Sequence, residues 1–270
     1  MKKQILIVGS GFSGMWAAVS AARLSALTGN NALSIAVLAP VAELRVRPRF
    51  YEEKVATLVA PLSDLFAELD IEFIAGSAER IDANNKSVVW RDANGQEMTL
   101  SYERLVLATG SQTKRPPIAG LAEYAFDIDQ LESAQVFEQH LDSLVARPST
   151  PERNTVVVCG GGFTGIELAT ELPARLRARF GNETTTKVIV VERGAAIGGR
   201  YSEALRNTIE AASEELGIEW RLNSEIEAID AGGVTLKNGE RIASATVVWT
   251  AGVEANTLSQ QIDGERDSQG

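Results

Sequence analysis

The feature that most constrains the fold is a glycine-rich stretch, N-T-V-V-V-C-G-G-G-F-T-G-I-E, at residues 154–167. Four apolar residues, 156–159, run without a polar break into three glycines: Gly160, Gly162 and Gly165. This order predicts a buried strand, a tight turn and the start of a helix. Because glycine has no Cβ, such a turn lets backbone N–H groups approach a pyrophosphate, as dinucleotide-binding turns do. A purely structural glycine turn is the alternative.

A second apolar stretch, residues 188–191, follows and ends at Glu192. An acid at this place in a strand–turn–helix–strand unit holds the ribose hydroxyls of an adenosine. We therefore expect a preference for NADH, because the 2′-phosphate of NADPH would meet a like charge. Arg193 is a complication, since a guanidinium one residue on can neutralise a phosphate.

The composition excludes several classes of function. The formal net charge is −10 and the main basic cluster is the short group Arg45, Arg47 and Arg49, so no nucleic-acid partner is expected. No apolar run approaches the ~18 residues that a membrane span needs, and the chain is expected to be cytoplasmic. The single cysteine, Cys159, excludes an intrachain disulfide and a multi-thiolate metal site, and no metal site is predicted.

The N-terminus repeats the glycine pattern. Apolar residues 4–8 lead into a second G-x-G-x-x-G: Gly9, Gly11 and Gly14. An alanine-rich helix is expected over residues 15–27. This position, one strand into the chain, is where a flavin-binding domain usually starts.

The acid expected after the second strand of this first unit is missing. The strand, residues 34–38, is followed by Ala39, and whether Glu43 replaces the acid stays open. Residues 41–53 are too irregular for a strand or a helix, and an amphipathic helix is expected over residues 58–69.

The irregular segment 41–53 is unusually rich in arginine. One interpretation is a solvated surface loop. The other is a loop over a bound cofactor, because functional residues concentrate on loops carried by rigid scaffolds. In that second interpretation the cofactor lies near one or more of the following residues: Arg45, Arg47, Phe50 or Tyr51.

The chain contains one architecture twice. Each glycine loop is followed by short alternating strands, an N-G hairpin turn and a closing glycine. The two loops, at Gly9 and Gly160, lie 151 residues apart, and the closing glycines, Gly110 and Gly252, lie 142 apart. So many motifs in one order indicate a duplication. The only histidine, His140, lies in a predicted helix over residues 129–145 and is expected to be a surface residue.

The paired loops, A-T-G at residues 108–110 and T-A-G-V at residues 250–253 resemble the two-dinucleotide-binding-domain flavoproteins, the pyridine nucleotide-disulphide oxidoreductase-like family. Within that family, G-G-G-F-T-G-I-E and W-T-A-G-V most resemble the type II NADH dehydrogenases, or NADH:quinone oxidoreductases. The resemblance covers nearly the whole chain. The redox cysteines of the family's disulfide reductases are missing here, which excludes that chemistry.

The resemblance implies an α/β fold of two Rossmann-like domains, the NAD domain inserted in the FAD domain and each carrying a small antiparallel β-meander. The expected boundaries are 1–113 for the first part of the FAD domain, 114–250 for the NAD(H) domain and 251–270 for an incomplete return. The family continues further, so the chain is expected to lack a C-terminal part. Peripheral attachment to the inner face of the membrane through that part is a further expectation.

The resemblance also implies FAD and NAD(H) as cofactors and a small-molecule electron acceptor, above all a quinone. Glu167 is the implied catalytic residue, which positions the nicotinamide or relays a proton. The alternative is an acid that the helix macrodipole favours in a first turn. The implied cofactor-binding residues are Gly9, Gly11, Phe12, Ser13, Gly14, Arg45, Ala78, Thr109, Gly110, Gly160, Gly162, Phe163, Thr164, Gly165, Glu192, Ala251 and Gly252.

Two other functions stay open at this point. One is a redox-sensing nucleotide-binding module without efficient turnover, which the missing ribose acid favours. The other is a ferredoxin- or rubredoxin-type reductase, whose acidic protein acceptor would need a basic patch. The only candidate patch is the cluster Arg45, Arg47 and Arg49. The oligomeric state stays open as well, and a homodimer is compatible with the sequence.

Overall fold

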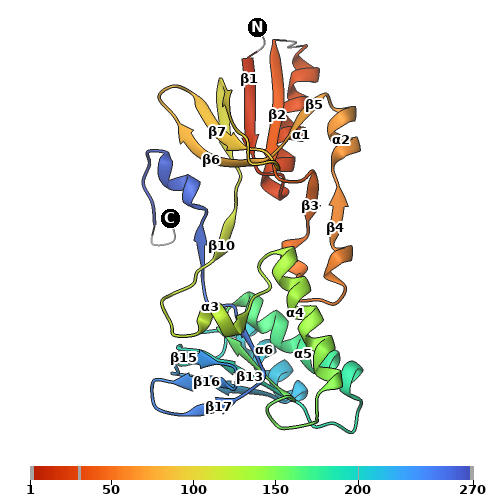
Figure 1. Cartoon of the computed structure of the whole chain (residues 1–270), viewed down its shortest axis with the longest axis vertical. Coiled ribbons are helices and arrows are strands. Elements are labelled where there is room, and N and C mark those ends of the chain that lie inside the picture. Colours follow the sequence, from red (N-terminus) through yellow and green to blue (C-terminus); the bar gives the residue numbers. More distant parts are fainter. Residues whose placement is uncertain (1–2, 30–31, 200, 268–270) are drawn as a thin grey trace. The chain divides into compact units, whose positions relative to one another are not determined.

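The structure is a computed structural model that describes residues 3–29, 32–199 and 201–267 (Figure 1). The chain divides into two compact units. Unit 1 takes in the described residues up to 45, then 59–112 and those from 253 onward, and unit 2 takes in 46–58 and 113–252. The expected domain boundaries stay a prediction, but one feature was not foreseen: a segment from the first half of the chain, residues 46–58, belongs to unit 2.

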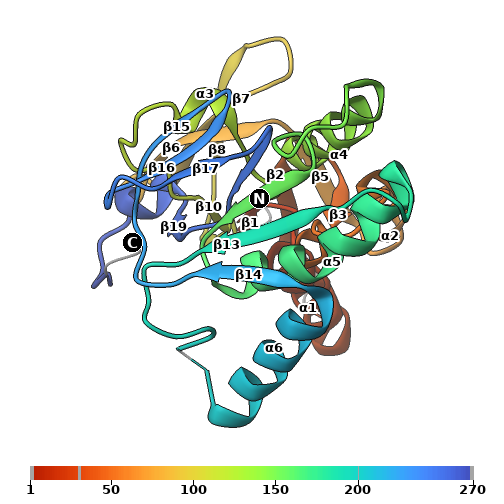
Figure 2. The ribbon, with the colours of Figure 1, turned by 90° about the horizontal axis from the view of Figure 1, so that it is seen from below.

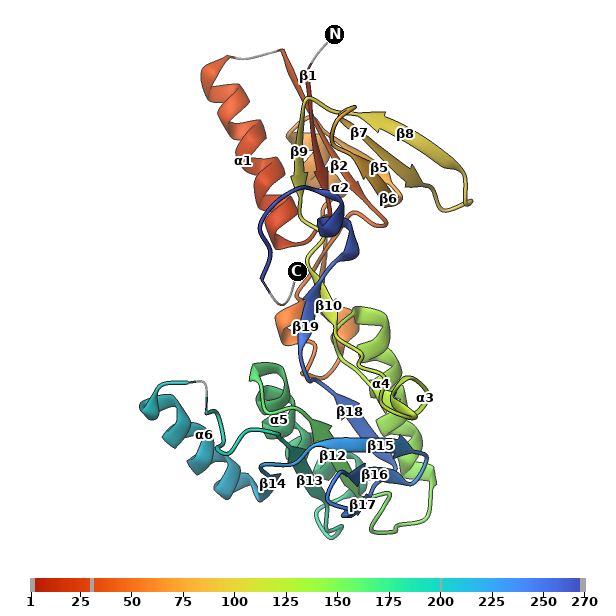
Figure 3. The ribbon, with the colours of Figure 1, turned by 90° about the vertical axis from the view of Figure 1, so that its left-hand side faces the viewer.

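Unit 1 is built on a parallel sheet with the strand order β5-β2-β1-β9 (Figure 3). The elements of this layer are β1 (Lys3–Val8), α1 (Phe12–Thr28), β2 (Leu33–Ala39), α2 (Ser63–Glu68), β5 (Ile71–Ala75) and β9 (Arg104–Leu107). An antiparallel sheet adds β6 (Ser77–Asp82), β7 (Ser87–Arg91) and β8 (Glu97–Ser101). Alternate residues bury both faces of the parallel sheet: Ile7 packs in the core with α1 and α2, and Leu6 in the core with β6 and β7.

Unit 2 has a parallel sheet in the order β11-β18-β12-β13-β14. The neighbouring strands β13 and β14 of this sheet lie side by side in Figure 2. Its elements are α3 (Leu121–Tyr124), β11 (Ala125–Phe126), α4 (Leu131–Ser143), η3 (Leu144–Ala146), β12 (Thr155–Cys159), α5 (Phe163–Phe180), β13 (Lys187–Val191), α6 (Glu203–Leu216), β14 (Ile218–Arg221) and β18 (Thr246–Trp249). An antiparallel sheet, β15 (Ile226–Asp230), β16 (Gly233–Leu236) and β17 (Arg241–Ala243), shares a core with β12, β13 and β18.

The two units repeat one topology. The order β5-β2-β1-β9 corresponds to β14-β13-β12-β18. In each unit a three-stranded antiparallel sheet comes, in sequence, just before the last of these parallel strands, β9 or β18. Even the register irregularity recurs, because the first strand of each antiparallel sheet is shifted, between Ala78 and Arg80 and between Ile226 and Ala228. The α/β fold with two Rossmann-like units, each with its own β-meander, is therefore confirmed.

Short elements join these layers. They are β3 (Glu43–Arg45), η1 (Arg47–Arg49), η2 (Val55–Thr57), β4 (Val59–Pro61), β10 (Ser111–Thr113), β19 (Val253–Ala255) and η4 (Thr257–Gln261). The strand β3 pairs with β4, and β10, which leaves the first sheet, pairs with β19, which returns. None of the helices in the described part of the chain combines the length and apolar character that crossing a membrane requires.

Two expectations about the region after β2 are wrong. Residues 41–53 are not free of regular structure, since they contain β3 and η1. The helix expected over residues 58–69 forms only as α2, because its first part is the strand β4, held by pairing with β3. Pro61 explains the difference, since a proline disfavours the helical conformation of the residue before it.

Candidate dinucleotide-binding sites

Each glycine turn connects the first strand of its unit to the first long helix. Gly9 has φ +112° and Gly160 has φ +116°, a backbone conformation that residues with a Cβ rarely adopt. The N–H of Gly9 donates to the carbonyl of Leu38 at 2.9 Å, and that of Gly160 to Val191 at 2.9 Å. Each turn is thereby fixed against the end of the neighbouring strand.

The third glycine of each turn is required by close packing. A Cβ on Gly14 would lie 1.9 Å from the carbonyl oxygen of Gly9. A Cβ on Gly165 would lie at the same distance from the carbonyl oxygen of Gly160. Both glycines lie inside their helices, so α1 and α5 begin earlier than the sequence suggested and rest directly on the turns.

The middle glycines have a different environment. A Cβ on Gly11 or on Gly162 would meet nothing within 4 Å, and their φ values of −64° and −77° are ordinary. Each is the N-cap of its helix, and among the described residues no side chain caps either helix and no acid lies in either first turn. The first N–H groups of α1 and α5 are thus left for another acceptor. A pyrophosphate fits both turns, because it supplies acceptor oxygens and negative charge.

Glu192 is bound to the second turn. Its Oε2 accepts a hydrogen bond from the N–H of Gly161 at 2.7 Å, and its Oε1 accepts one from Gly194 at 2.7 Å. The side chain is half-buried. A carboxylate offers about four lone-pair positions, so these two bonds leave acceptor capacity for ribose hydroxyls. The sequence placed the acid at the strand end, but not its two backbone donors.

In the first turn, Ser10 takes the place of Gly161. Its hydroxyl lies 3.0 Å from the carbonyl oxygen of Val41 and 3.2 Å from that of Glu43, and its single proton is shared between them. The Glu43 carboxylate pairs with Arg45 Nε at 3.4 Å. The first turn is therefore held by a hydroxyl and two backbone carbonyls, where the second is held by a carboxylate. Nothing in the local sequence pattern indicates this role of Ser10.

The closing strands end alike in both units. Gly110 (φ +66°) accepts a backbone hydrogen bond from Asn256 at 3.2 Å, and Gly252 (φ +88°) accepts one from Lys114 at 3.1 Å. Thr109 and Ala251 are the residues directly before these two glycines.

A model of the pyridine nucleotide-disulphide oxidoreductase family matches residues 3–270. The chain belongs to this family. An NADH dehydrogenase-like protein of Mycobacterium tuberculosis is 38% identical over 99% of this chain and 67% of its own length. A demethylphylloquinone reductase of Synechocystis is 28% identical over 100% of the chain and 66% of the relative. This oxidoreductase-family chain thus spans about two thirds of the length of these relatives.

Solved structures show the same fold. The structure of NDH2 from Plasmodium falciparum in complex with NADH has a TM-score of 0.84 at 16% identity, over 97% of this chain and 57% of that one. A sulfide:quinone oxidoreductase from Aquifex aeolicus has a TM-score of 0.77 at 22% identity, over 96% and 61%. At these identities the likeness concerns the fold of this family member alone.

Glu167 is the fifth residue of α5, so the expectation that it lies in the first turn is wrong. The helix begins at Phe163, two residues before the last loop glycine. Glu167 is half-buried, and burial raises its pKa. A raised carboxyl pKa is a feature that acid–base groups of active sites often share. The equivalent residue of α1 is Trp16, whose side chain is 60% exposed.

The remaining predicted cofactor residues lie around the two turns or in the first antiparallel sheet. Phe12 and Ser13 begin α1 as Phe163 and Thr164 begin α5, and both phenylalanines are exposed. The ring of Phe163 packs against Tyr201, with centroids 4.2 Å apart. Ala78 lies in β6, opposite Trp90 of β7. These assignments remain predictions.

The arginine cluster is not a free basic patch. Arg47 pairs with Asp129, and Arg49 pairs with Glu52, while Arg45 pairs with Glu43 as described above. The solvated-loop interpretation of the segment is wrong for Phe50, because this residue is only 2% exposed. The segment after β3 packs as part of unit 2.

His140 is not the surface residue that was expected. Its Nε2 lies 2.9 Å from the Thr246 hydroxyl, and its ring packs against Phe126 with centroids 4.3 Å apart. Burial, followed by the charge of Arg147, lowers the pKa of His140 to about 4. It is therefore a neutral, hydrogen-bonded residue between α4 and the sheet of unit 2.

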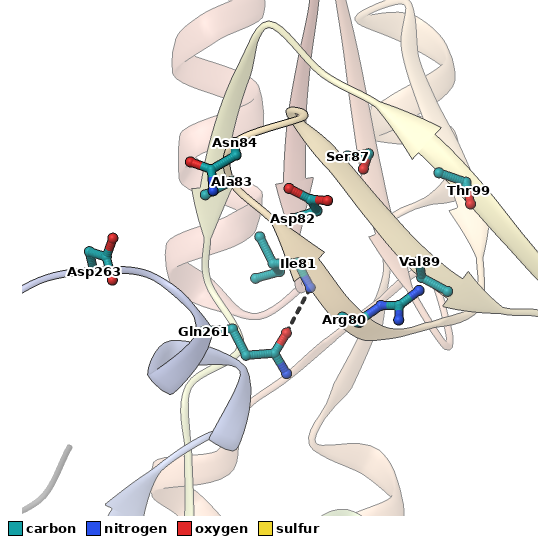
Figure 4. Close-up of a pocket in the computed structure, with 10 residues that line it drawn as sticks. All are labelled: Arg80, Ile81, Asp82, Ala83, Asn84, Ser87, Val89, Thr99, Gln261 and Asp263. Atoms are coloured by element: carbon teal, nitrogen blue, oxygen red, sulfur yellow. Dashed lines mark hydrogen bonds between the residues drawn. The ribbon is translucent and has the colours of Figure 1, made fainter.

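A cavity of about 550 Å³ in unit 1 lies away from the glycine turn. It is lined by β6, β7, β8 and the segment around η4, where Gln261 accepts a hydrogen bond from the N–H of Ile81 at 2.7 Å (Figure 4). In the part of the chain that the structure describes, no group of three or more His, Cys, Asp or Glu side chains is arranged to hold a metal ion.

Proposed function

We propose that this protein is an FAD-dependent NADH oxidoreductase, with FAD at the glycine turn of unit 1 and NADH at the turn of unit 2. The observation that carries the proposal is the pair of open helix N-termini at Gly11 and Gly162, each behind glycines whose neighbours leave no room for a Cβ. The relatives named NADH dehydrogenase-like support the same donor.

In this proposal the flavin accepts a hydride from NADH and passes two electrons on, and the protein supplies binding and orientation. The N–H groups at the starts of α1 and α5 hold the two pyrophosphates. Glu192 accepts hydrogen bonds from the adenosine ribose while the Gly161 N–H keeps it in place. Glu167 positions the nicotinamide or takes up a proton, which the direction of its pKa favours.

The domain assignment follows from this placement. We propose that residues 1–113 and 251–270 belong to the FAD domain and 114–250 to the NAD(H) domain, with the segment 46–58 reaching the latter. The remaining predicted cofactor residues, among them Arg45, Ala78 and Thr109, are proposed to contact the flavin side.

We propose a quinone as the electron acceptor. Support comes from the demethylphylloquinone reductase and from a type II NADH:quinone oxidoreductase of Staphylococcus haemolyticus, 26% identical over 76% of this chain and 52% of that relative. A protein acceptor is less well supported, because the three arginines that would bind an acidic partner each have an acidic partner within the chain. The homodimer and a membrane attachment stay predictions.

The test is a steady-state assay of the full-length protein with NADH or NADPH as donor and a short-chain quinone, ferricyanide or oxygen as acceptor. The proposal expects NADH-driven quinone reduction well above oxygen reduction. Turnover only with a small acidic electron-transfer protein would favour the reductase alternative. Nucleotide binding without turnover on any acceptor would favour the sensor alternative.

A separate variant, Glu167→Gln, tests the acid. It keeps the side-chain volume and removes the charge and the proton site, so we expect slower flavin reduction or slower reoxidation at unchanged FAD content. Stopped-flow rates that equal the parent's in both half-reactions would show that Glu167 has no chemical role.

A further inference from the structure

Phe163 is the first residue of α5 and follows Gly162, the open N-cap. Aromatic side chains of a helix point back toward its N-terminus, so the Phe163 ring leans toward the turn to which we assign the pyrophosphate of NADH. The ring is 56% exposed. An exposed ring changes its rotamer freely unless a neighbouring side chain restricts it.

Tyr201 is such a neighbour. The rings of Phe163 and Tyr201 have centroids 4.2 Å apart, and their planes are inclined by 31°. Two aromatic rings in contact attract each other, which restricts the rotamers of both. Unit 1 differs at this point, because Phe12 begins α1 and is 44% exposed, but no aromatic ring in the described part of the chain stacks on it.

The Tyr201 ring has a defined place of its own. Its backbone N–H donates to the carbonyl oxygen of Gly198 at 2.9 Å. Gly198 has φ +58°, and a Cβ on it would lie 3.1 Å from Tyr201 Cδ2 and 3.2 Å from Cδ1 of Ile209, a buried residue of α6. The glycine therefore lets the tyrosine ring rest close to the backbone beside the start of α6.

Two side chains thus hold the residues on either side of Gly162. Glu192, directly after β13, accepts a hydrogen bond from the Gly161 N–H at 2.7 Å. Tyr201, two residues before α6, stacks on Phe163. Gly162 itself stays uncovered, since a Cβ on it would meet nothing within 4 Å apart from its chain neighbours. The proposed pyrophosphate seat is therefore framed on both sides and open in the middle.

We propose that Tyr201 is a positioning residue of the NADH site: its ring holds the Phe163 ring at the edge of the pyrophosphate seat, so that the seat is formed before NADH binds. This inference rests on the proposed function for the identity of the ligand. A side chain that a ligand must first immobilise lowers the affinity, whereas one that the protein already holds does not. Tyr201 thus acts on the affinity for the dinucleotide and not on the hydride transfer.

The contact itself is tested without any nucleotide in the NADH site. The full-length protein is labelled with fluorinated phenylalanine, and the ¹⁹F NMR signal of Phe163 is assigned as the one lost in Phe163→Leu. In Tyr201→Ala this signal should move, because the ring current of the tyrosine is removed. Tyr124→Ala, at an exposed tyrosine of α3, is the matched control and should leave it in place. An unmoved Phe163 signal in Tyr201→Ala overturns the proposal.

The consequence for binding is measured by titration calorimetry with ADP-ribose, which keeps the pyrophosphate and lacks the nicotinamide. Tyr201→Ala should weaken binding about two- to tenfold, the effect of immobilising one side chain. Tyr201→Phe, which keeps the ring, should restore the affinity of the parent. In a Phe163→Ala background, Tyr201→Ala should change the affinity by less than about twofold, because no phenyl ring is left to hold.

An equal loss of affinity in both backgrounds, or no loss in either, overturns the proposal. If Tyr201→Ala does not fold, Tyr201→Leu takes its place in both measurements, since leucine keeps an apolar side chain but has no ring to stack.

The kinetics of flavin reduction separate this inference from the proposed function. Tyr201→Ala should raise the NADH concentration at half-maximal rate by the same factor as the ADP-ribose affinity falls, with the maximal rate of the parent. A lower maximal rate at unchanged half-saturation overturns the positioning role. A parent that binds neither ADP-ribose nor NADH overturns the proposed function, whereas a parent that binds both only as tightly as Tyr201→Ala overturns this inference alone.

Discussion

The two glycine turns have the same backbone but different partners. Gly9 and Gly160 share a positive φ, and a Cβ on Gly14 or Gly165 would meet the carbonyl of its turn at the same distance. Beyond that, the second turn is bound by the Glu192 carboxylate, and the first is bound through the Ser10 hydroxyl to two carbonyls. The backbone of the turn is therefore the same in both halves of this duplicated chain, whereas the side chain that holds the turn has diverged.

The helices that follow the turns differ in a second way. At the fifth position, α1 presents the exposed Trp16 and α5 the half-buried Glu167. Only the second helix also contacts the segment 46–58, through Arg175, which donates to the Tyr51 carbonyl, and Arg179, which binds the Glu53 carboxylate. Equal backbones thus carry different side chains, and only the second helix places a titratable group at this position.

The largest expected effect comes from the third glycine. Gly14→Ala and Gly165→Ala would push a Cβ to 1.9 Å from a backbone oxygen, so we expect a loss of about 3 kcal/mol or more in the free energy of unfolding of the unit concerned. Gly11→Ala and Gly162→Ala are the matched controls, with open space and ordinary φ, and should change it by less than about 1 kcal/mol. Thermal and denaturant unfolding measure the difference. Equal stabilities within either pair would show that the turns are not packed as described.

Glu192 should matter in both binding and stability. Glu192→Gln removes the charge that accepts from two N–H groups, which we expect to cost about 1–2 kcal/mol of folding free energy. The preference for NADH over NADPH should fall about tenfold in kcat/KM, because repulsion of the 2′-phosphate is lost. Glu225→Gln, an exposed acid paired with Lys237, is the control. A parent that prefers NADPH would refute the assignment of Glu192 to the ribose.

The third prediction uses the only histidine, which lies in unit 2. The folded pKa of His140, about 4, lies below its ordinary value of about 6.5, so the unfolded state binds more protons between these values. Stability from neutral His140 is therefore complete above pH 6.5 and is lost as the pH falls toward 4. Because the ring is partly exposed, we expect on the order of 1–2 kcal/mol.

The check is the pH dependence of unfolding for the parent minus that of His140→Gln. The glutamine cannot gain a proton, so the difference isolates the imidazole from the many carboxylates that titrate in this range. If the difference in the free energy of unfolding between the two proteins did not change from pH 7 to pH 4, the His140 side chain would have to be solvated in the folded state.

The smallest expected effect is at Ser10. Ser10→Ala removes the hydroxyl that joins the first turn to the backbone of residues 41 and 43, and about 0.5–1 kcal/mol should be lost. Ser13→Ala, which also lies in the G-S-G-F-S-G stretch, is the control. Denaturant midpoints at constant slope measure the change. A loss as large as that of Glu192→Gln would mean that the two turns depend on their side-chain partners equally.

Much of the fold could be predicted because its signals are local. The strands before Gly9 and Gly160, the helices after them and the Asn94-Gly95 and Asn238-Gly239 hairpins follow from short patterns. The repeated motifs indicated that one topology occurs twice, but the order of the strands came only from the structure. The helix starts were missed by two or three residues because Gly14 and Gly165 look like turn residues but pack inside helices.

The errors concern residues whose partners are far away in the sequence. The strand β4 forms because residues 43–45 pair with it, and His140 is buried by Thr246 and Phe126. Neither partner is visible in a local pattern. The contact between Arg175 and Tyr51 had one signal that could have been used: Arg175 falls among the apolar residues that α5 buries, such as Leu168, Leu172 and Leu176.

The most direct test of two separate dinucleotide sites is to block each turn in the full-length protein and to record flavin content and reduction by NADH. Valine at the middle glycine fits the backbone and projects into the space where a pyrophosphate would lie. Gly11→Val should purify without yellow colour. Gly162→Val should stay yellow, and its flavin should be reduced by dithionite but not by NADH. A Gly11→Val protein with a normal flavin spectrum, or a Gly162→Val protein reduced by NADH at the parent's rate, would contradict the assignment of FAD to the first turn and NADH to the second.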